Sequence, residues 1–82
     1  MSKSIFSEKY NRFRELLVKA RRLADLTQSE LSVQLSRPQS YVSKYERGER
    51  RLDLIEFLEV AEALQIEPAA FINKLLEEKE ED

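Results

Sequence analysis

The residues able to carry chemistry are restricted by composition, because the 82-residue chain contains no Cys and no His. This excludes thiol and imidazole catalysis, disulfides, and zinc sites built from Cys and His ligands. Acidic residues recur at three-residue spacing as Glu56, Glu59 and Glu62. That spacing places them on one stripe of a helix with no partner acid, so we interpret them as a solvated face. We expect neither an enzyme nor a metal or cofactor site.

The polar side chains of greatest interest lie in the segment 28–47. Positions that would face outward from the second of two short helices hold Gln39, Ser40, Ser43, Lys44 and Arg47. A Gln side chain can hydrogen-bond adenine N6 and N7, and a Lys side chain can donate to guanine O6 and N7. Arg and Lys also attract phosphates independently of sequence. These residue types favour contact with a DNA groove, and the alternative is an ordinary solvated helix face.

Helices must position these residues, since one Gly, two Pro and no alternating β-branched run predict an all-α fold. Ser7 is the expected N-cap of a first helix that ends near Asp25. The apolar face of this helix steps by three and four residues through Phe6, Tyr10, Phe13, Leu17, Ala20 and Ala24. Arg21 and Arg22 in its last turn are expected to be solvated, next to the negative end of the helix dipole.

Two short helices are expected next. Thr27 and Glu30 match a capping box, so one helix begins at Gln28. Pro38 suits the first turn of the following helix, and Gly48 suits its left-handed C-terminal end. The contact between the two helices is expected to consist of Leu31, Ser32, Leu35, Val42 and Tyr45.

Two further helices complete the pattern. Asp53 and Glu56 give another cap signal. The fourth helix that follows has an apolar face of Leu54, Phe57, Leu58, Ala61 and Leu64. Pro68 begins a fifth helix, whose apolar side holds Phe71, Ile72, Leu75 and Leu76. Because short connections force neighbouring helices to pack together, we expect one compact domain over residues 1–76 and an acidic tail at 77–82.

Charge is unevenly distributed along the chain. Residues 1–51 hold twelve Lys and Arg against six Asp and Glu, whereas residues 52–82 hold two against ten. This asymmetry favours a protein that turns one side to a polyanion, although chance scatter over solvated faces explains it equally well. No apolar run approaches the roughly 18 residues of a membrane span, and the N-terminus has no apolar signal-peptide core. We expect a cytoplasmic protein with no membrane partner.

Three segments of the chain resemble one known family. They read L-T-Q-S-E-L, Y-V-S-K-Y-E-R-G-E-R-R and L-I-E-F-L-E-V-A-E-A-L. Together they are similar to the Xre/Cro-repressor-type helix-turn-helix family, over about residues 13–72. The resemblance implies a compact five-helix bundle, a lambda-repressor-like DNA-binding domain that usually works as a homodimer on a palindromic operator. It places the helix-turn-helix at 28–47 and the recognition helix at about 38–47.

The same resemblance implies roles for individual residues. The positions that reach base edges are Gln39, Ser40 and Lys44. The positions near phosphate or the DNA backbone are Gln28, Tyr41, Ser43, Arg47, Arg50 and Arg51. Glu46 falls at a structural position, and Tyr41 is expected to be exposed because Tyr45 is the core member of the pair. Simpler interpretations stay open, with Gln28 an ordinary first-turn residue and with Arg50 and Arg51 paired to Glu49 and Asp53.

The turn between the two helices departs from the family pattern of Gly followed by an apolar residue, since Ser36 and Arg37 stand there. Ser is less favourable than Gly where φ is positive, so the turn either differs or carries a small strain. Arg37 is expected to lay its stem on apolar surface and extend its guanidinium to a phosphate. Because Pro38 replaces the usual Ser or Thr cap, Ser36 and Gln39 are a candidate substitute capping box.

The fourth and fifth helices hold more apolar residues than a small core needs. A twofold dimer interface built from Ile55, Phe71, Ile72, Leu75 and Leu76 is favoured over simple packing of the fifth helix onto the first and fourth. A chain this short buries only about 60% of its unfolded surface, so dimerisation would stabilise it.

The expected function is that of a sequence-specific transcriptional regulator, such as a repressor, which binds double-stranded DNA as a homodimer. Contact with RNA polymerase is a further expectation for an activator. The alternative is an antitoxin or other protein-interaction module, in which a toxin or another partner protein binds the fourth and fifth helices. Such a module is expected to lose polar groups at positions 39, 40 and 44, and this chain retains them.

Overall fold

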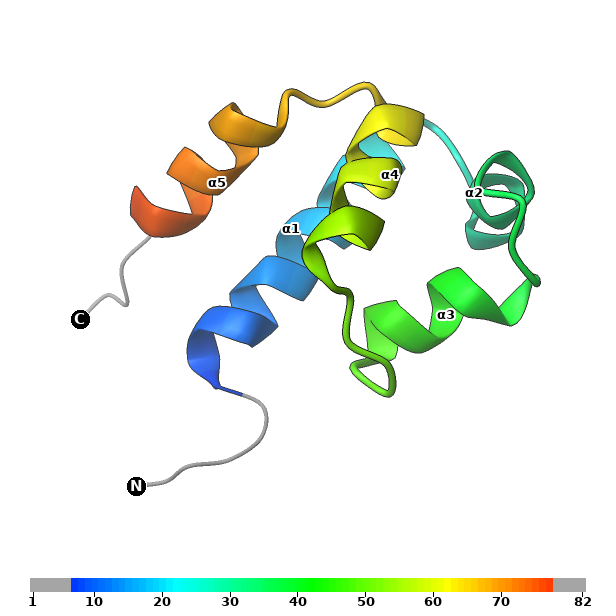
Figure 1. The fold of residues 1–82 in the computed structure, drawn as a ribbon, viewed down its shortest axis with the longest axis horizontal. Helices are drawn as coiled ribbons and strands as arrows, with labels where there is room; N and C mark the ends of the chain where they lie inside the picture. Colours follow the sequence, from blue (N-terminus) through cyan, green and yellow to red (C-terminus); the bar gives the residue numbers. More distant parts are fainter. Residues whose placement is uncertain (1–6, 78–82) are drawn as a thin grey trace.

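The computed structural model describes residues 7–77, which form five α-helices and no strand (Figure 1). The helices are α1 (Glu8–Leu23), α2 (Gln28–Gln34), α3 (Ser40–Arg47), α4 (Leu54–Leu64) and α5 (Pro68–Glu77). The predicted all-α, five-helix fold is confirmed. Phe6 and residues 78–82 of the predicted tail lie outside the described residues, and Glu77 is the last residue of α5.

Side-chain caps fix where three of these helices begin. Ser7 accepts a hydrogen bond at 3.0 Å from a backbone N–H in the first turn of α1. Thr27 with Glu30, and Asp53 with Glu56, form complete capping boxes at α2 and α4. Each cap satisfies backbone N–H groups that the first turn of a helix leaves without an intrahelical partner. The N-caps predicted for these three helices are confirmed.

Left-handed residues reverse the chain after four helices, and Ser36 after α2 is one of them. Gly48, with φ of 84°, ends α3 as predicted. Gln65, with φ of 60°, ends α4. α1 ends at Leu23, close to the predicted Asp25, which itself has φ of 61°. These local reversals keep the connections short, so that successive helices must pack against one another.

The core lies where α1, α3 and α4 meet, and α2 and α5 close it from either end of the molecule (Figure 1). Its fully buried side chains include Leu17, Leu31, Val42, Tyr45 and Val60. Three aromatic rings also join α1, α4 and α5. The ring centroid of Phe57 in α4 lies 5.7 Å from that of Phe13 in α1 and 5.2 Å from that of Phe71 in α5. Burial of each large apolar side chain stabilises the fold by about 1.5–3 kcal/mol.

The buried face of α4 differs from the predicted one. It consists of Phe57, Val60, Ala61 and Leu64. Leu54 and Leu58 are 64% and 40% exposed, so the prediction that they face the core is wrong. The four buried residues already complete a stripe of three- and four-residue steps, which leaves both leucines on its flank. Ala24 is also exposed rather than buried, because it lies beyond the end of α1 as its C-cap.

The arrangement places the two short helices α2 and α3 together at one end of the molecule and α5 at the other (Figure 1). No helix between residues 7 and 77 combines the length and apolar character needed to cross a membrane.

Candidate nucleic-acid interface

The turn between α2 and α3 is held by the backbone and by one buried side chain. Ser36 has φ of 56°, so the chain adopts a left-handed turn there without a glycine. Arg37 N donates to Ser32 O at 3.0 Å, and the Ser32 hydroxyl donates to Gln39 O at 3.1 Å. Ser32 is fully buried, so its small side chain lets the helices approach while its hydroxyl ties the turn to α2. A non-glycine residue in this conformation costs about 1–2 kcal/mol.

The recognition helix α3 begins at Ser40, two residues after the predicted start at Pro38. Pro38 instead forms a turn, in which its carbonyl accepts from Tyr41 N at 2.9 Å. The substitute cap predicted from Ser36 and Gln39 is wrong, because Gln39 stands at the N-cap without a side-chain hydrogen bond. An N-cap whose side chain accepts from the first turn typically has extended backbone. Gln39 is already helical and Ser36 is left-handed, so neither has the backbone conformation of a side-chain cap.

The outward side of α3 carries the predicted base-contacting residues. Gln39, Ser40 and Lys44 are exposed, and Ser43 is half-buried. Among residues 7–77, no hydrogen bond or ion pair engages the side chains of Gln39, Ser40 or Lys44. A shallow depression beside them is lined by Arg21, Thr27, Gln28, Ser29, Gln39, Ser40 and Ser43. The donors and acceptors of this face are therefore available to a ligand.

Gln28 stands at the edge of the same face, where its side chain is held in place. Its Nε2 donates to Glu46 Oε1 at 2.8 Å, and the residue is half-buried. A carboxamide nitrogen carries two N–H donors, so one of them remains for another acceptor. The interaction with Glu46 is thus compatible with the predicted phosphate contact.

Glu46 is a structural residue that joins three helices. Its carboxylate accepts from Arg21 Nε at 2.8 Å and Arg21 Nη2 at 3.1 Å, in addition to the Gln28 contact. Arg21 and Glu46 are each 8% exposed, so the prediction that Arg21 is solvated is wrong. The hydrogen bond to Glu46 raises the pKa of the Arg21 guanidinium, against the lowering effect of burial. A third guanidinium N–H reaches Leu26 O at 2.9 Å.

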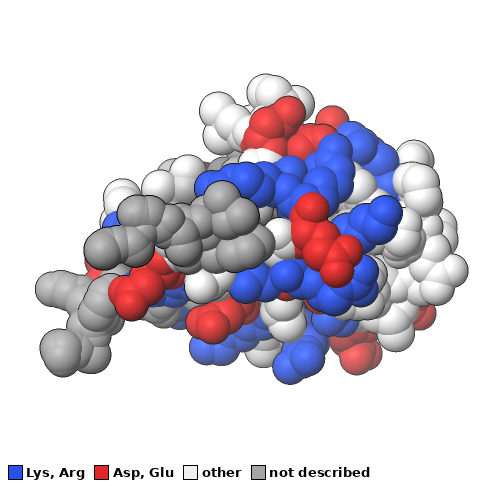
Figure 2. Space-filling model, turned by 90° about the horizontal axis from the view of Figure 1, so that it is seen from below, with Lys and Arg blue, Asp and Glu red and all other residues white. Residues whose placement is uncertain are grey.

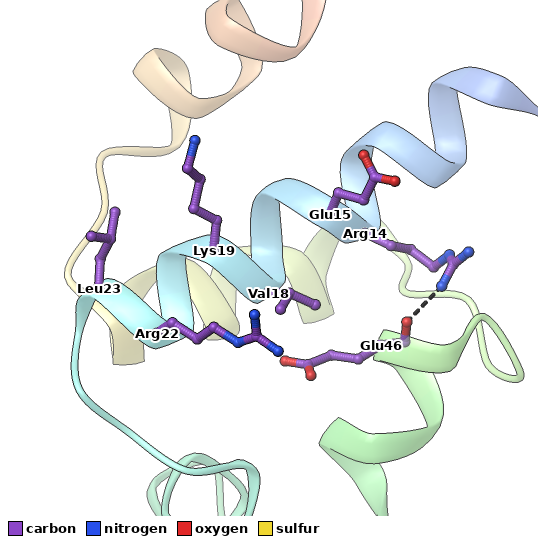
Figure 3. A pocket seen from close by; sticks show the side chains of 7 residues that line it. All are labelled: Arg14, Glu15, Val18, Lys19, Arg22, Leu23 and Glu46. Atoms are coloured by element: carbon purple, nitrogen blue, oxygen red, sulfur yellow. Dashed lines mark hydrogen bonds between the residues drawn. The ribbon is translucent and has the colours of Figure 1, made fainter.

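A second arginine ties α1 to the end of α3. Arg14 Nη1 donates to the backbone carbonyl of Glu46 at 2.6 Å, and its Nη2 donates to Asn11 Oδ1 at 2.8 Å. Figure 3 shows Arg14 and Glu46 meeting across a groove beside α1. The groove is lined by Arg14, Glu15, Val18, Lys19, Arg22, Leu23 and Glu46. It contains none of the residues predicted to contact DNA.

Tyr41 is only 6% exposed, so the prediction of an exposed side chain is wrong. Its ring packs edge-on against Tyr45 with centroids 5.6 Å apart, because residues four apart share one side of a helix. The guanidinium carbons of Arg37 and Arg50 lie 4.7 Å and 4.9 Å from the Tyr41 ring centroid. Burial raises the pKa of the Tyr41 hydroxyl. The ring therefore supports two of the predicted phosphate-contacting cations.

The same two cations are bound by acids of α4. Arg50 donates from Nη1 to Glu56 Oε1 at 3.1 Å and from Nη2 to Glu56 Oε2 at 2.7 Å. Arg37 Nη2 donates to Glu59 Oε1 at 3.0 Å, and Arg37 Nη1 lies 3.9 Å from Glu56 Oε2. Two hydrogen bonds lower the pKa of Glu56 to about 2: the larger effect comes from Arg50 and the next from the backbone N–H of Asp53.

The remaining predicted cations have other contacts. Arg47 donates to Glu49 through Nε at 2.9 Å and Nη2 at 3.0 Å, and through Nη1 to Ser43 Oγ. One interpretation of the sequence paired Glu49 with Arg50. In the structure Glu49 pairs with Arg47 instead. Arg51 places its guanidinium 4.0 Å from the centroid of the Tyr10 ring.

The face that includes α3 and the loop after it is rich in charge. Figure 2 shows Lys and Arg side chains across much of the middle of this face, with acidic side chains set between them. The mixture agrees with the ion pairs just described, since several arginines of this region each carry a carboxylate partner.

The predicted dimer residues differ in their exposure. Ile55, Ile72 and Leu76 are exposed, and Leu75 is half-buried. Phe71 is 8% exposed and belongs to the core, so its predicted place in an interface is wrong. Its ring instead lies with its centroid 5.9 Å from that of Phe13 of α1 and 5.2 Å from that of Phe57 of α4. Leu54 and Leu58 extend the exposed apolar surface of α4.

Sequence reasoning missed two features of this region. The spacing of Tyr41 and Tyr45 already placed both rings on one side of α3, and that signal pointed to a buried pair. The role of Glu56 in binding Arg50 had no sequence signal beyond its cap motif. Ion pairs between a loop and the next helix depend on how the loop folds back.

Two short helices joined by a tight turn, with a polar and basic outer side on the second, define a helix-turn-helix protein of the class that binds DNA and regulates transcription. Comparison with protein families agrees: the model described as Helix-turn-helix matches residues 17–71. The chain belongs to this family, the XRE-type helix-turn-helix proteins.

Solved structures support the assignment. An XRE-family like protein from Pseudomonas syringae pv. tomato str. DC3000 is 46% identical, with a TM-score of 0.80 over 83% of each chain. The wild-type restriction-modification controller protein C.Esp1396I shares the fold at 21% identity, with a TM-score of 0.77 over 85% of this chain and 92% of that one. No curated protein matches the sequence.

Proposed function

We propose that the protein binds a palindromic DNA operator as a homodimer and regulates transcription by placing α3 in the major groove. The observation that carries this proposal is the outer side of α3, where Gln39, Ser40 and Lys44 are exposed and make no side-chain hydrogen bond or ion pair with any of the residues 7–77. The opposite side of α3 is buried through Val42 and Tyr45. Only the polar side can therefore enter a groove, with its N-terminal residues next to base edges.

Phosphate contacts are assigned to the residues around this face. They are Gln28, Arg37, Ser43, Arg47, Arg50 and Arg51. Tyr41 keeps a role in the same set only as the platform beneath Arg37 and Arg50, because its ring is buried. Contacts of this kind position the protein on the duplex and supply affinity without reading sequence.

The homodimer is proposed to form through the exposed apolar side chains of α4 and α5, chiefly Ile55, Ile72 and Leu76. Twofold pairing would set two recognition helices about 34 Å apart, one turn of DNA, which suits a palindrome. Occupation of a promoter by such a dimer represses transcription, and the protein would act in the cytoplasm. Contact with RNA polymerase through a remaining face would activate it instead.

The decisive experiment is selection of bound duplexes from a random-sequence DNA pool. We expect an enriched motif with two inverted half-sites whose centres are about 10 base pairs apart. Recovery of a pool without any enriched motif, from protein shown to be folded, would contradict sequence-specific binding.

A protein-interaction module is the second candidate, favoured by the same exposed apolar residues, which fit a partner protein such as a toxin as well as a second copy. The two functions separate in a salt titration on random-sequence DNA. A DNA-binding protein loses affinity steeply as salt rises, because binding releases counterions from the phosphates. A module that no longer binds DNA shows no such dependence.

A further inference from the structure

Two acids of α4 occupy the cations that the proposed DNA complex needs. The Glu56 carboxylate binds both terminal nitrogens of Arg50, at 3.1 Å and 2.7 Å, and Glu59 binds Arg37 at 3.0 Å. The Glu56 side chain is 15% exposed, whereas those of Arg50 and Arg37 are 39% and 31% exposed. Glu56 thus lies behind the arginines, on the protein side of the surface, whereas the Glu59 side chain is 49% exposed and meets Arg37 at the surface.

We propose that Glu56, assisted by Glu59, restrains Arg37 and Arg50 and so limits the affinity of this protein for DNA of any sequence. The inference rests on the proposed function, because it assigns these arginines to phosphate contacts. Glu56 is a positioning residue in this scheme. It touches no DNA itself and acts through the two guanidinium groups.

Glu56 and a DNA phosphate would compete for the same N–H groups of Arg50. A guanidinium binds a carboxylate or a phosphate through parallel N–H donors, and Arg50 already uses both terminal nitrogens on Glu56. A phosphate that contacts Arg50 must displace that carboxylate or accept the few donors left over. An arginine that stays neutralised releases fewer DNA counterions, so it adds less to the affinity and to its salt dependence.

Glu56 is held more firmly than Glu49, which pairs with Arg47 nearby. Both side chains of that pair are more than half exposed, and such surface pairs contribute little. Glu56 additionally accepts the backbone N–H of Asp53 at 3.0 Å within the capping box of α4. Its carboxylate is therefore fixed to the start of a helix and cannot move aside with the arginine.

The Tyr41 ring completes the restraint. Arg37 and Arg50 both lie against it, within 5 Å of its centroid, so each guanidinium is held between an aromatic surface and a carboxylate. Among the described residues, ion pairs in this cluster join Arg37, Arg50, Glu56 and Glu59, and the negative charge of Asp53 also acts on Arg50. Two cations and two anions cancel, and the cluster presents little net charge to DNA.

The test compares Glu56→Gln with the wild-type protein on a random-sequence DNA duplex. Gln keeps the capping box, because its side-chain oxygen can still accept from Asp53 N, and it removes only the negative charge. We expect binding about three- to tenfold tighter at low salt, with a salt dependence steeper by about one to two counterions. Glu59→Gln, which releases Arg37 alone, is expected to give a smaller gain.

Glu77→Gln is the matched control, since it makes the same change in net charge at the exposed end of α5, far from α3 (Figure 1). We expect less than about a twofold effect from that variant. The inference is overturned if Glu56→Gln binds no more tightly than wild type, or if Glu77→Gln matches it. If Glu56→Gln does not fold in a thermal melt, Glu59→Gln decides, and unchanged binding by that variant overturns the inference. A wild-type protein with no salt-dependent DNA binding would instead overturn the proposed function itself.

Discussion

Gln39 and Lys44 differ from the arginines around them in their contacts within the protein. Both side chains are exposed on α3 and have no hydrogen bond or ion pair within residues 7–77, whereas Arg37, Arg47 and Arg50 each bind a carboxylate. Binding of a base edge by Gln39 or Lys44 therefore breaks no hydrogen bond or ion pair within this described part of the chain. Gln39 and Lys44 are therefore suited to recognising bases, whereas the paired arginines are suited to binding phosphates of any DNA sequence.

Replacement of Gln39 by Ala is expected to weaken binding to the selected DNA motif by about 5- to 150-fold, the equivalent of about 1–3 kcal/mol for a lost pair of base contacts. The thermal midpoint should stay nearly unchanged, because an exposed side chain is removed. Fluorescence anisotropy on the motif and on random-sequence DNA checks this. An equal loss on both duplexes would show that Gln39 does not read bases.

At the scale of single helices, α3 is held by the buried pair of Arg21 and Glu46. The pair joins the end of α1 to the last turn of α3, and Gln28 adds the start of α2 to the same carboxylate. The polar face of α3 is thus oriented by a contact on its opposite side. Buried charges of this kind are costly to separate, because one charge is left without its partner in a poorly solvated place.

Replacement of Arg21 by Met is expected to lower the free energy of unfolding by about 3 kcal/mol, since Glu46 would remain buried and unpaired. A double variant, Arg21→Met with Glu46→Leu, is expected to recover most of that loss. Urea denaturation of the two variants measures the difference. A single variant as stable as the wild-type protein would show that the pair does not hold α3.

The start of α4 gives a prediction for pH. The pKa of Glu56 is lowered from 4.5 to about 2 by its hydrogen bonds to Arg50 and Asp53 N. A carboxyl whose pKa is lower in the folded state stabilises the protein above the ordinary pKa and loses that effect as the pH falls through the folded value. We expect wild-type stability to fall between about pH 4.5 and pH 2 more than that of Glu56→Gln. Urea denaturation at several pH values in this range measures the free energy of unfolding of both proteins. An equal dependence of that free energy on pH would contradict the lowered pKa of Glu56.

At the scale of the whole molecule, the helices α2 and α3, which we propose to bind DNA, lie at one end and α5 lies at the other (Figure 1). Exposed apolar side chains remain on α4 and α5. The predicted interface residue Phe71 belongs to the core, so the proposed interface depends on Ile55, Ile72 and Leu76, with Leu54 and Leu58 beside them.

Replacement of Ile55 by Asp is expected to weaken self-association at least tenfold, because a charge would be buried against an apolar partner surface. The monomer should keep its fold, since Ile55 is 62% exposed. Sedimentation equilibrium of the wild-type and variant proteins measures the change. Leu23→Asp is the control, because Leu23 is 81% exposed on α1, outside the proposed interface. Identical behaviour of both variants would argue against a dimer through α4.

Local chemistry was sufficient to predict much of the fold from the sequence. Ser7, Thr27 and Asp53 mark helix starts, and Gly48 marks the end of α3, because caps and left-handed turns depend on residues within one helical turn of each other. The outward set of Gln39, Ser40 and Lys44 follows from the period of the helix and needs no tertiary information.

Only the tertiary structure decided which charges meet. Arg21 was expected in solvent and is buried with Glu46, 25 residues further along the chain. Tyr41 was expected at the surface and instead lies beneath Arg37 and Arg50. Helical periodicity indicates on which face of a helix a side chain lies. Which residues it contacts depends on how separate helices pack, and the local sequence pattern does not encode that packing.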